Sequence, residues 1–297
     1  MIEKNTINFM SEDTMCAGWF FKTEKEEKAP CVILAHGFCG VKEMRLDAYA
    51  ERFAEAGYHA LVFDYRHFGG SDGKPRQLLD IRKQLQDWQS AIQFAKELPG
   101  VDADKLILWG TSFSGGHVLK TALKVDSIAA VISQVPHMNG FASAAMAGLR
   151  QNVRLGVASM IDLVKNLFNS SPFYVPAIGK PGELAAMTAP GESEAYLELI
   201  PEGHDPDQLS LSVAARVFFY IPYYSPGRLA SKLSVPWLVQ VALQDQTTPP
   251  SPAIKAAKKA QNAELITYDT GHFDVYVQPG FETTIKDQLS FLKKHVT

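Results

Sequence analysis

Six short apolar runs, separated by stretches with helical periodicity, constrain the fold of this chain more than any other feature. Each run is rich in aliphatic and β-branched residues and has the length of a strand buried on both faces of a parallel sheet. The runs are CVILAHG (31–37), HALVFDY (59–65), KLILWG (105–110), IAAVISQV (128–135), VPWLVQVAL (235–243) and AELITYD (263–269). Strands that alternate with helices in this way predict an α/β fold, a mostly parallel sheet with helices on both faces.

Three further segments have a clear local pattern. Residues 44–58 carry apolar side chains at helical spacing. Between residues 78 and 98 the apolar positions step by three and four, which predicts one long helix. At the start of the chain, residues 5–21 contain two β-prone runs around a turn and predict a hairpin.

The alternation of strands and helices is interrupted in the second half of the chain. The interval contains an apolar helical segment at 153–168 and an aromatic cluster, but no low-complexity linker. We therefore predict a core made of residues 1–137 and 233–297. Residues 138–232 should form an ordered insertion over the sheet, because they are too many for a simple loop.

The composition narrows the choice of partner and compartment. With 46% hydrophobic residues the chain can bury a full core, and its net charge of −3 offers no basic stripe for nucleic acid, so we expect a small-molecule substrate. The three cysteines form no C-x-x-C pair, so we expect reduced thiols and no cysteine zinc site. No signal peptide pattern and no run of ~20 apolar residues is present, so we expect no membrane and a cytoplasmic protein.

Reactive side chains follow several of the predicted strands. In open parallel sheets, functional groups gather at the carboxyl ends of the strands. Ser112, Asp245 and His272 each come just after an apolar run. A serine hydroxyl attacks only when an imidazole takes its proton, and a carboxylate must orient that imidazole. We therefore predict that Ser112 is the nucleophile, His272 its base and Asp245 the orienting acid.

The serine lies in a motif that resembles a nucleophile elbow. The stretch GTSFS (110–114) departs from G-x-S-x-G only in its last position, and small flanking residues let a strand and a helix approach closely. The oxyanion that forms during acyl transfer needs two backbone donors. We predict that these are the N–H groups of Phe38 and Phe113.

Other side chains near the strand ends have competing interpretations. Asp274 is the second candidate for the acid, and His137 could be the base or line the pocket. Cys39 lies beside the predicted oxyanion loop but has no elbow, so we expect a buried thiol. We expect structural roles for three further residues. His36 would brace the oxyanion loop, and His117 would be packed. Asp64 would belong to a structural turn, because its glycine-rich loop lacks the lysine of a phosphate site.

Aromatic residues are concentrated in the insertion. They favour a hydrophobic, uncharged substrate, and we take Phe218, Phe219 and His137 as candidate substrate-binding residues. The alternative is that the aromatics form the insertion's own small core or a dimer surface, which leaves a homodimer open. They are Phe168, Phe173, Tyr174, Phe218, Phe219, Tyr220, Tyr223 and Tyr224.

The motifs AHGF, FDYRHFGGSDG and WGTSFSGG, the aspartate of ALQDQTTPP and the histidine of TGHFDVY occur in this order. With them the chain resembles serine hydrolases of the α/β-hydrolase superfamily over roughly residues 30–137 and 233–295. The resemblance implies that the insertion is a helical cap between the sixth and seventh core strands. The stretches KEMRLDAYAERFAEAGYHALVFDYRHFGGSDG and GTSFSGGHVL are similar to bacterial hydrolases and fungal polyketide transferases, which also resemble hydrolases of the X-prolyl dipeptidyl peptidase and cocaine esterase type.

This resemblance implies cleavage of an ester or thioester through an acyl-enzyme, with no metal or organic cofactor. Epoxide hydrolases and dehalogenases of the superfamily use an aspartate nucleophile, and Ser112 argues against them. Two alternatives remain: an acyl or polyketide transferase that uses the same acyl-enzyme, and a non-catalytic binding protein on this scaffold. The complete Ser/Asp/His set argues against the binding protein.

Overall fold

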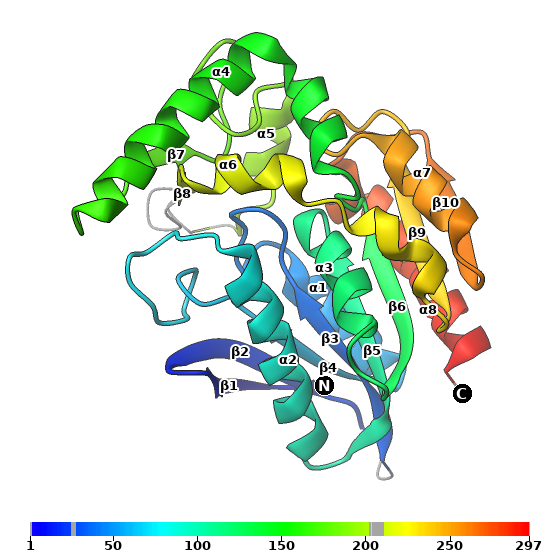
Figure 1. Ribbon diagram of the computed structural model, residues 1–297. Helices are drawn as coiled ribbons and strands as arrows, with labels where there is room; N and C mark the ends of the chain where they lie inside the picture. The colour runs from blue at the N-terminus through cyan, green and yellow to red at the C-terminus, as the bar shows by residue number, and fades with distance from the viewer. Residues whose placement is uncertain (1, 25–27, 202, 204–210, 297) are drawn as a thin grey trace.

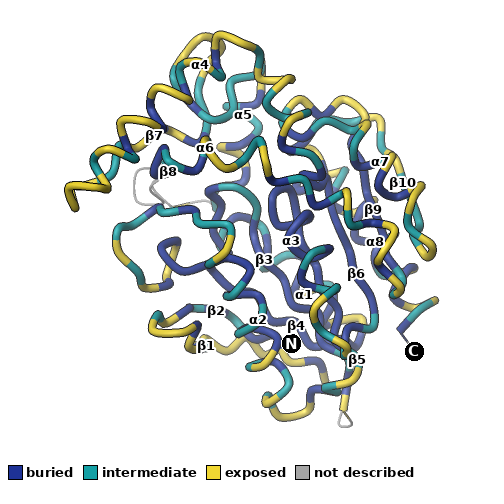
Figure 2. Tube along the Cα trace, in the orientation of Figure 1, coloured by how far each residue is buried: buried dark blue, intermediate teal, exposed yellow. Residues whose placement is uncertain are grey.

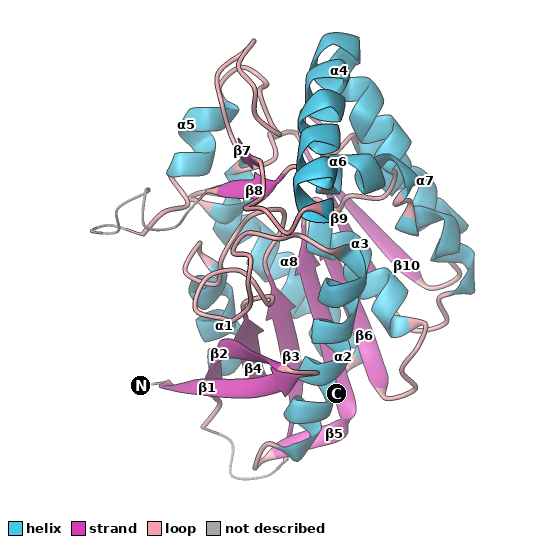
Figure 3. Cartoon of the chain, turned by 60° about the vertical axis from the view of Figure 1, so that its left-hand side comes forward, coloured by secondary structure: helices cyan, strands magenta, loops and turns pink. Residues whose placement is uncertain are grey.

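The centre of the molecule is an eight-stranded sheet, seen in a computed structural model that describes residues 2–24, 28–201, 203 and 211–296. The strand order is β1-β2-β4-β3-β5-β6-β9-β10, and the six strands from β4 to β10 in this order run parallel (Figures 1 and 3). The β1–β2 hairpin extends one edge, with β2 antiparallel to β4. The strands are β1 (Glu3–Ser11), β2 (Thr14–Lys22), β3 (Ala29–Ala35), β4 (His59–Phe63), β5 (Val101–Thr111), β6 (Ile128–Gln134), β9 (Trp237–Ala242) and β10 (Ala263–Tyr268). Each predicted apolar run contributes one parallel strand, and the predicted hairpin is present, which confirms the predicted fold class.

Helices cover both faces of the sheet. Side chains of α2, α3 and α7 pack into one hydrophobic cluster, and those of α1 and α8 pack into another, so consecutive strand residues such as Ile33 and Leu34 belong to different clusters. Figure 2 shows the strands between these layers as buried. The helices are α1 (Leu46–Glu55), α2 (Ile81–Glu97), α3 (Phe113–Ala122), α7 (Pro250–Lys259) and α8 (Gly280–His295), with a short 3-10 turn, η4 (Asp274–Tyr276).

The long helix α2 begins three residues later than the apolar periodicity predicts. Asp80 has an extended backbone, and its carboxylate accepts hydrogen bonds from the N–H groups of Arg82 and Lys83. This satisfies two donors that a helix leaves free in its first turn. The N-cap therefore excludes Leu78 from the helix.

Residues 140–201 and 211–223, between β6 and β9, lie over the carboxyl ends of the strands (Figure 1). Their main helix, α4, covers the predicted helix at 153–168 except for Phe168, its C-cap, but begins much earlier and is broken at Gly148, where φ is 80°. The break explains why helical periodicity alone finds only the later part. The elements are α4 (Gly140–Leu167), β7 (Tyr174–Pro176), α5 (Glu192–Leu197), β8 (Ser212–Ala214), α6 (Val217–Tyr220) and two 3-10 turns, η2 (Ile221–Tyr223) and η3 (Pro226–Lys232). The division into core and cap stays a prediction.

Candidate active site

Ser112 sits on a strained turn between β5 and α3. Its φ is 53° and its ψ is −118°, a backbone conformation that residues other than glycine rarely adopt. A Cβ on Gly110 would overlap the Ser114 carbonyl oxygen, so the strand and the helix leave no room for a side chain there. Ser114, which replaces the usual glycine, is buried, and its hydroxyl lies 2.7 Å from the Tyr65 hydroxyl. The hydrogen bond between these two groups explains how the departure from the motif is tolerated.

The three side chains predicted at the strand ends lie in contact. His272 Nε2 is 3.1 Å from Ser112 Oγ, and His272 Nδ1 is 2.6 Å from Asp245 Oδ2. All three side chains are buried. Because a carboxylate only accepts hydrogen bonds, Nδ1–H donates to Asp245 and Nε2 is left to accept the serine proton. This is the arrangement that a serine nucleophile, its base and an orienting acid require.

The loops after β9 and β10 bring the acid to the histidine. Pairing of these strands continues past their ends, where the Leu243 N–H donates to the Tyr268 carbonyl and the Gln244 N–H donates to the Thr270 carbonyl. The next residue is Asp245, which therefore lies beside the loop that carries His272.

Two threonines after Asp245 hold its carboxylate. Asp245 Oδ1 accepts hydrogen bonds from the backbone N–H groups of Thr247, at 2.8 Å, and Thr248, at 2.6 Å. The Thr248 hydroxyl donates to the other oxygen, Oδ2. Sequence reasoning missed these threonines, although an aspartate that accepts from N–H groups two and three residues later is a common turn and could have been read from DQTT.

The loop after β3 lies against the nucleophile. A Cβ on Gly37 would be 2.7 Å from Ser112 Cβ, so only glycine allows the loop this close. His36 Nδ1 donates to the Gly37 carbonyl at 3.0 Å, and its other nitrogen accepts from the Tyr65 N–H at 3.4 Å, in agreement with the predicted bracing role. Within the described residues, no hydrogen bond occupies the N–H of Phe38. The Phe38 ring packs edge-on against Phe113, the residue that follows the serine.

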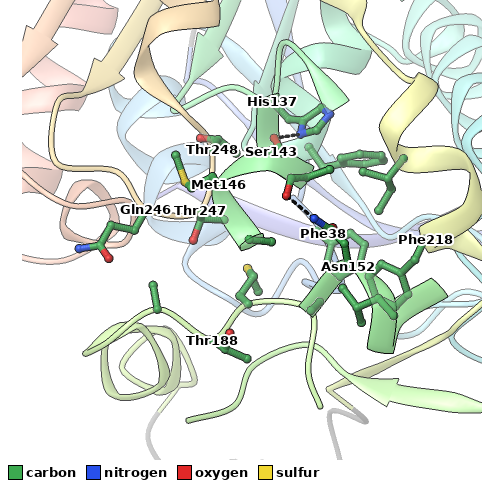
Figure 4. A pocket seen from close by; sticks show the side chains of 18 of the residues that line it. Phe38, His137, Ser143, Met146, Asn152, Thr188, Phe218, Gln246, Thr247 and Thr248 are labelled. Carbon is green, nitrogen blue, oxygen red and sulfur yellow. Dashed lines mark hydrogen bonds between the residues drawn. The ribbon is translucent and has the colours of Figure 1, made fainter. Parts of the chain in front are cut away.

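A cavity of about 590 Å³ opens beside Ser112 and is lined mostly by apolar side chains (Figure 4). Its floor is formed by Ser112, Phe38 and Phe113, and its walls come from α4, residues 186–192, the α6–η2 segment and residues 246–248. Sequence reasoning did not find the α4 and 186–192 walls, because neither segment carries a motif. A much smaller cavity of about 40 Å³ touches both Ser112 and His272 and has room for a water molecule.

Two of the three predicted substrate-binding residues line the large cavity. His137 and Phe218 do so (Figure 4), whereas Phe219 is not among the lining residues, is 49% exposed and packs against Tyr220. The prediction for Phe219 is corrected: successive residues of a helix point about 100° apart, so α6 can turn only one of the two rings inward. The His137 backbone N–H donates to the Ser112 carbonyl at 2.8 Å, but its ring makes no hydrogen bond to the Ser112 hydroxyl; Ser143 and the Tyr224 carbonyl are the hydrogen-bond partners of the ring. Burial lowers the pKa of His137 to about 4 and keeps its ring neutral.

The other aromatic residues of the insertion take different positions. Tyr224 is buried against the rings of Phe113 and His137, while Tyr220, Tyr223 and Phe168 are largely exposed. The outer side of α4 is also apolar and exposed over Leu149, Val153, Val157, Met160, Val164 and Leu167. The homodimer therefore stays a prediction.

The side chains of the alternative acid, Asp274, and of the alternative nucleophile, Cys39, make no hydrogen bond to the Ser112 hydroxyl or the His272 ring. The Asp274 carboxylate accepts a hydrogen bond from the Gly271 N–H at 2.7 Å and makes no hydrogen bond to the His272 ring. Cys39 is buried, and burial raises the pKa of its thiol well above the ordinary value, which leaves it as an unreactive thiol.

His117 and Asp64 have structural partners. The buried His117 ring lies between the Tyr224 hydroxyl at 2.6 Å and Gln84 Oε1 at 3.0 Å. The Asp64 carboxylate is fully buried, accepts from the Lys42 backbone and forms an ion pair with the Lys42 ammonium group at 2.7 Å. Both agree with the structural roles predicted for them.

Within the described part of the chain, no group of three or more His, Cys, Asp or Glu side chains could hold a metal ion. None of the helices in the same residues is both long and apolar enough to cross a membrane.

Comparison with known families matches residues 30–279 to the alpha/beta hydrolase fold. The chain belongs to the α/β-hydrolase family. It is 40% identical to the quorum-quenching protein AidA of Acinetobacter baumannii (strain MDR-ZJ06), over 98% of this chain and 94% of that protein. It is also 27% identical to the polyketide transferase af380 of Aspergillus fumigatus, over 91% of each chain.

Solved structures show the same fold. The α/β hydrolase GrgF from Penicillium sp. sh18 superimposes with a TM-score of 0.80 at 24% identity, over 99% of both chains. These comparisons confirm the predicted superfamily and the likeness to fungal polyketide transferases. As a member of this family, the chain is an ester-acting hydrolase.

Proposed function

We propose that this α/β hydrolase cleaves a carboxylic ester or thioester of a hydrophobic small molecule through an acyl-enzyme on Ser112. The observation that carries the proposal is His272, which lies within hydrogen-bond distance of both Ser112 Oγ and Asp245 Oδ2. An imidazole held in one tautomer by a buried carboxylate can take the serine proton as the hydroxyl attacks.

The reaction proceeds in two halves. Ser112 Oγ attacks the acyl carbon while its proton moves to His272 Nε2, and Asp245 stabilises the imidazolium. The negative charge on the former carbonyl oxygen is held by the N–H groups of Phe38 and Phe113. His272 then gives its proton to the leaving alcohol or thiol. In the second half, a water molecule loses a proton to His272 and attacks the acyl carbon, which releases the acid and restores Ser112.

The nature of the substrate follows from the lining of the large cavity. The cavity includes Phe38, Phe141 and Phe218 but no lysine or arginine among the described residues. An acyl chain removed from water by such walls gains about 25 cal/mol for each Å² of apolar surface buried. The cavity therefore favours an uncharged, hydrophobic acyl group.

Hydrolysis and acyl transfer differ only in the group that attacks the acyl-enzyme. The small cavity beside Ser112 and His272 has room for a water molecule and supports hydrolysis. The alternative is transfer to an alcohol or thiol, which the likeness to a polyketide transferase keeps open. The cytoplasmic location and the likeness to X-prolyl dipeptidyl peptidases and cocaine esterase stay predictions.

The test is covalent labelling with a fluorophosphonate, followed by intact-mass measurement. The wild-type protein should gain one adduct, Ser112→Ala none, and the matched control Ser114→Gly one, since Ser114 contacts Tyr65 and not His272. Equal labelling of Ser112→Ala would show that the nucleophile is another residue. Turnover of p-nitrophenyl esters of increasing chain length, with and without an added alcohol, then separates hydrolysis from transfer.

A further inference from the structure

Glu192 is the only acidic side chain among the described residues that line the large cavity. It is the first residue of the short helix α5 and is 8% exposed. One carboxyl oxygen, Oε1, accepts a hydrogen bond from the Thr247 hydroxyl. The other, Oε2, is buried and has no hydrogen-bond partner in the described part of the chain.

A buried carboxyl oxygen without a partner is costly. Burial in an apolar environment raises the pKa of Glu192, and the nearby Asp245 carboxylate raises it further, while the Thr247 hydroxyl, His272 and the Ala189 backbone act in the opposite sense. In native proteins such groups are nearly always paired, so an unpaired one beside a cavity calls for a ligand group to complete it.

Glu192 is close to the reactive groups. Thr247 connects it to the acid, because the hydroxyl of Thr247 bonds to Glu192 while its backbone N–H donates to Asp245 Oδ1. Thr247 and Ser112 both line the same cavity as Glu192. A substrate whose acyl carbon lies at Ser112 and whose acyl chain extends into this cavity therefore comes within reach of the Glu192 carboxyl.

We propose that Glu192 is a specificity-determining residue that accepts a hydrogen bond from a neutral donor, a hydroxyl or an amide N–H, carried by the acyl group near the reacting carbonyl. The inference rests on the proposed function and narrows its substrate class. A neutral donor fits better than an ammonium group, because the cavity is mostly apolar and would have to bury a second charge.

The experiment compares four p-nitrophenyl esters of similar length at pH 7. They are the hexanoate, the 3-hydroxyhexanoate, the N-butyrylglycinate and the 3-aminohexanoate, which offer no donor, a hydroxyl, an amide and an ammonium group. For each protein, kcat/KM of every substituted ester is divided by kcat/KM of the plain hexanoate. A site that hydrogen-bonds a substrate group discriminates strongly against the analogue that lacks it.

We expect Glu192→Leu to lower this ratio ten-fold or more for the hydroxyl or the amide ester, mainly through KM. Glu192→Gln should keep part of the ratio, because its amide oxygen still accepts a hydrogen bond. The matched control is Glu194→Leu, which removes an exposed carboxyl from the same helix and should leave the ratio unchanged. Circular dichroism checks that each variant is folded, and if Glu192→Leu is not, the ratio for Glu192→Gln decides.

Three results would overturn the inference. An equal loss on all four esters would show that Glu192 only supports Thr247, an unchanged ratio would show that it binds no donor, and an effect confined to the ammonium ester would show that it selects a cation. Failure of the proposed function is a separate outcome, since it would appear as turnover that survives in Ser112→Ala.

Discussion

Replacing Gly37 by alanine should move the predicted oxyanion loop away from the nucleophile. The added Cβ would lie 2.7 Å from Ser112 Cβ and 3.2 Å from Ser112 Oγ. Carbon atoms in contact prefer separations of about 3.5 to 4.0 Å, so the loop must retreat by about 1 Å. The backbone of Phe38, the next residue, moves with it.

The size of the expected loss in kcat follows from the known effect of removing one hydrogen-bond donor to the oxyanion. Removal of one such donor typically lowers kcat by about 10² to 10³, and a displacement of about 1 Å costs about 10². We therefore expect Gly37→Ala to lower kcat about 100-fold and to change KM little, because the N–H of Phe38 acts on charge that exists only in the transition state. Steady-state hydrolysis of a p-nitrophenyl ester measures both constants.

Gly40→Ala is the matched control on the same loop. Its Cβ would lie 3.3 Å from His36 Cβ, a contact that a shift of a few tenths of an ångström relieves, so we expect activity within about three-fold of wild type. Thermal unfolding of both variants shows whether the fold is kept. A folded Gly37→Ala with wild-type kcat would refute the reasoning that this loop supplies a donor to the oxyanion.

Three further predictions concern the orienting acid, the wall of the cavity and a buried histidine. Asp245→Asn should lower kcat by about 10⁴ with little change in the melting temperature, because the histidine loses the carboxylate that fixes its tautomer; a loss below ten-fold would contradict this. Phe218→Ala should raise KM for long acyl esters several-fold and Phe219→Ala should not, since only Phe218 lines the cavity; equal effects would contradict the assignment. Burial lowers the pKa of His117 to about 3, whereas an unfolded histidine titrates near 6.5. The unfolded state therefore takes up the proton first as the pH falls, and the free energy of unfolding from urea titrations should drop between about pH 6 and pH 4, by about 1.4 kcal/mol per pH unit for this residue. If the free energy of unfolding of His117→Gln fell with pH as steeply as that of the wild type, the contribution assigned to His117 would be wrong.

The fold could be predicted because its signals are local. Each buried parallel strand is a short apolar run, and each flanking helix repeats its apolar residues every three or four positions. The positions of Ser112, Asp245 and His272 were also local, since each follows a strand whose carboxyl end lies on the same edge of the sheet. Only the contact between the three side chains could not be predicted from local signals, because it depends on the conformation of the loops after β9 and β10.

The walls of the cavity could not be predicted in the same way. They come from α4 and from residues 186–192, which meet the serine only through tertiary packing. Glu192 lies in no recognisable motif, and its hydrogen-bond partner Thr247 is 55 residues away in the chain. The wrong inclusion of Phe219 beside Phe218 has the same origin, because α6 is only four residues long and shows no periodicity from which its inner side could be read.

The loop at residues 245–248 joins the reactive groups to the wall of the cavity. Asp245 Oδ1 is held by two backbone N–H groups, and Oδ2 is held by the Thr248 hydroxyl and His272. None of these four donors bonds to Glu192, whose carboxyl group accepts a hydrogen bond from the hydroxyl of Thr247. The orientation of the acid therefore does not depend on Glu192, and a substitution there should change which acyl group is selected while the proton transfer at His272 is left intact. This separation makes substrate preference, rather than the rate with a plain ester, the informative measurement on Glu192.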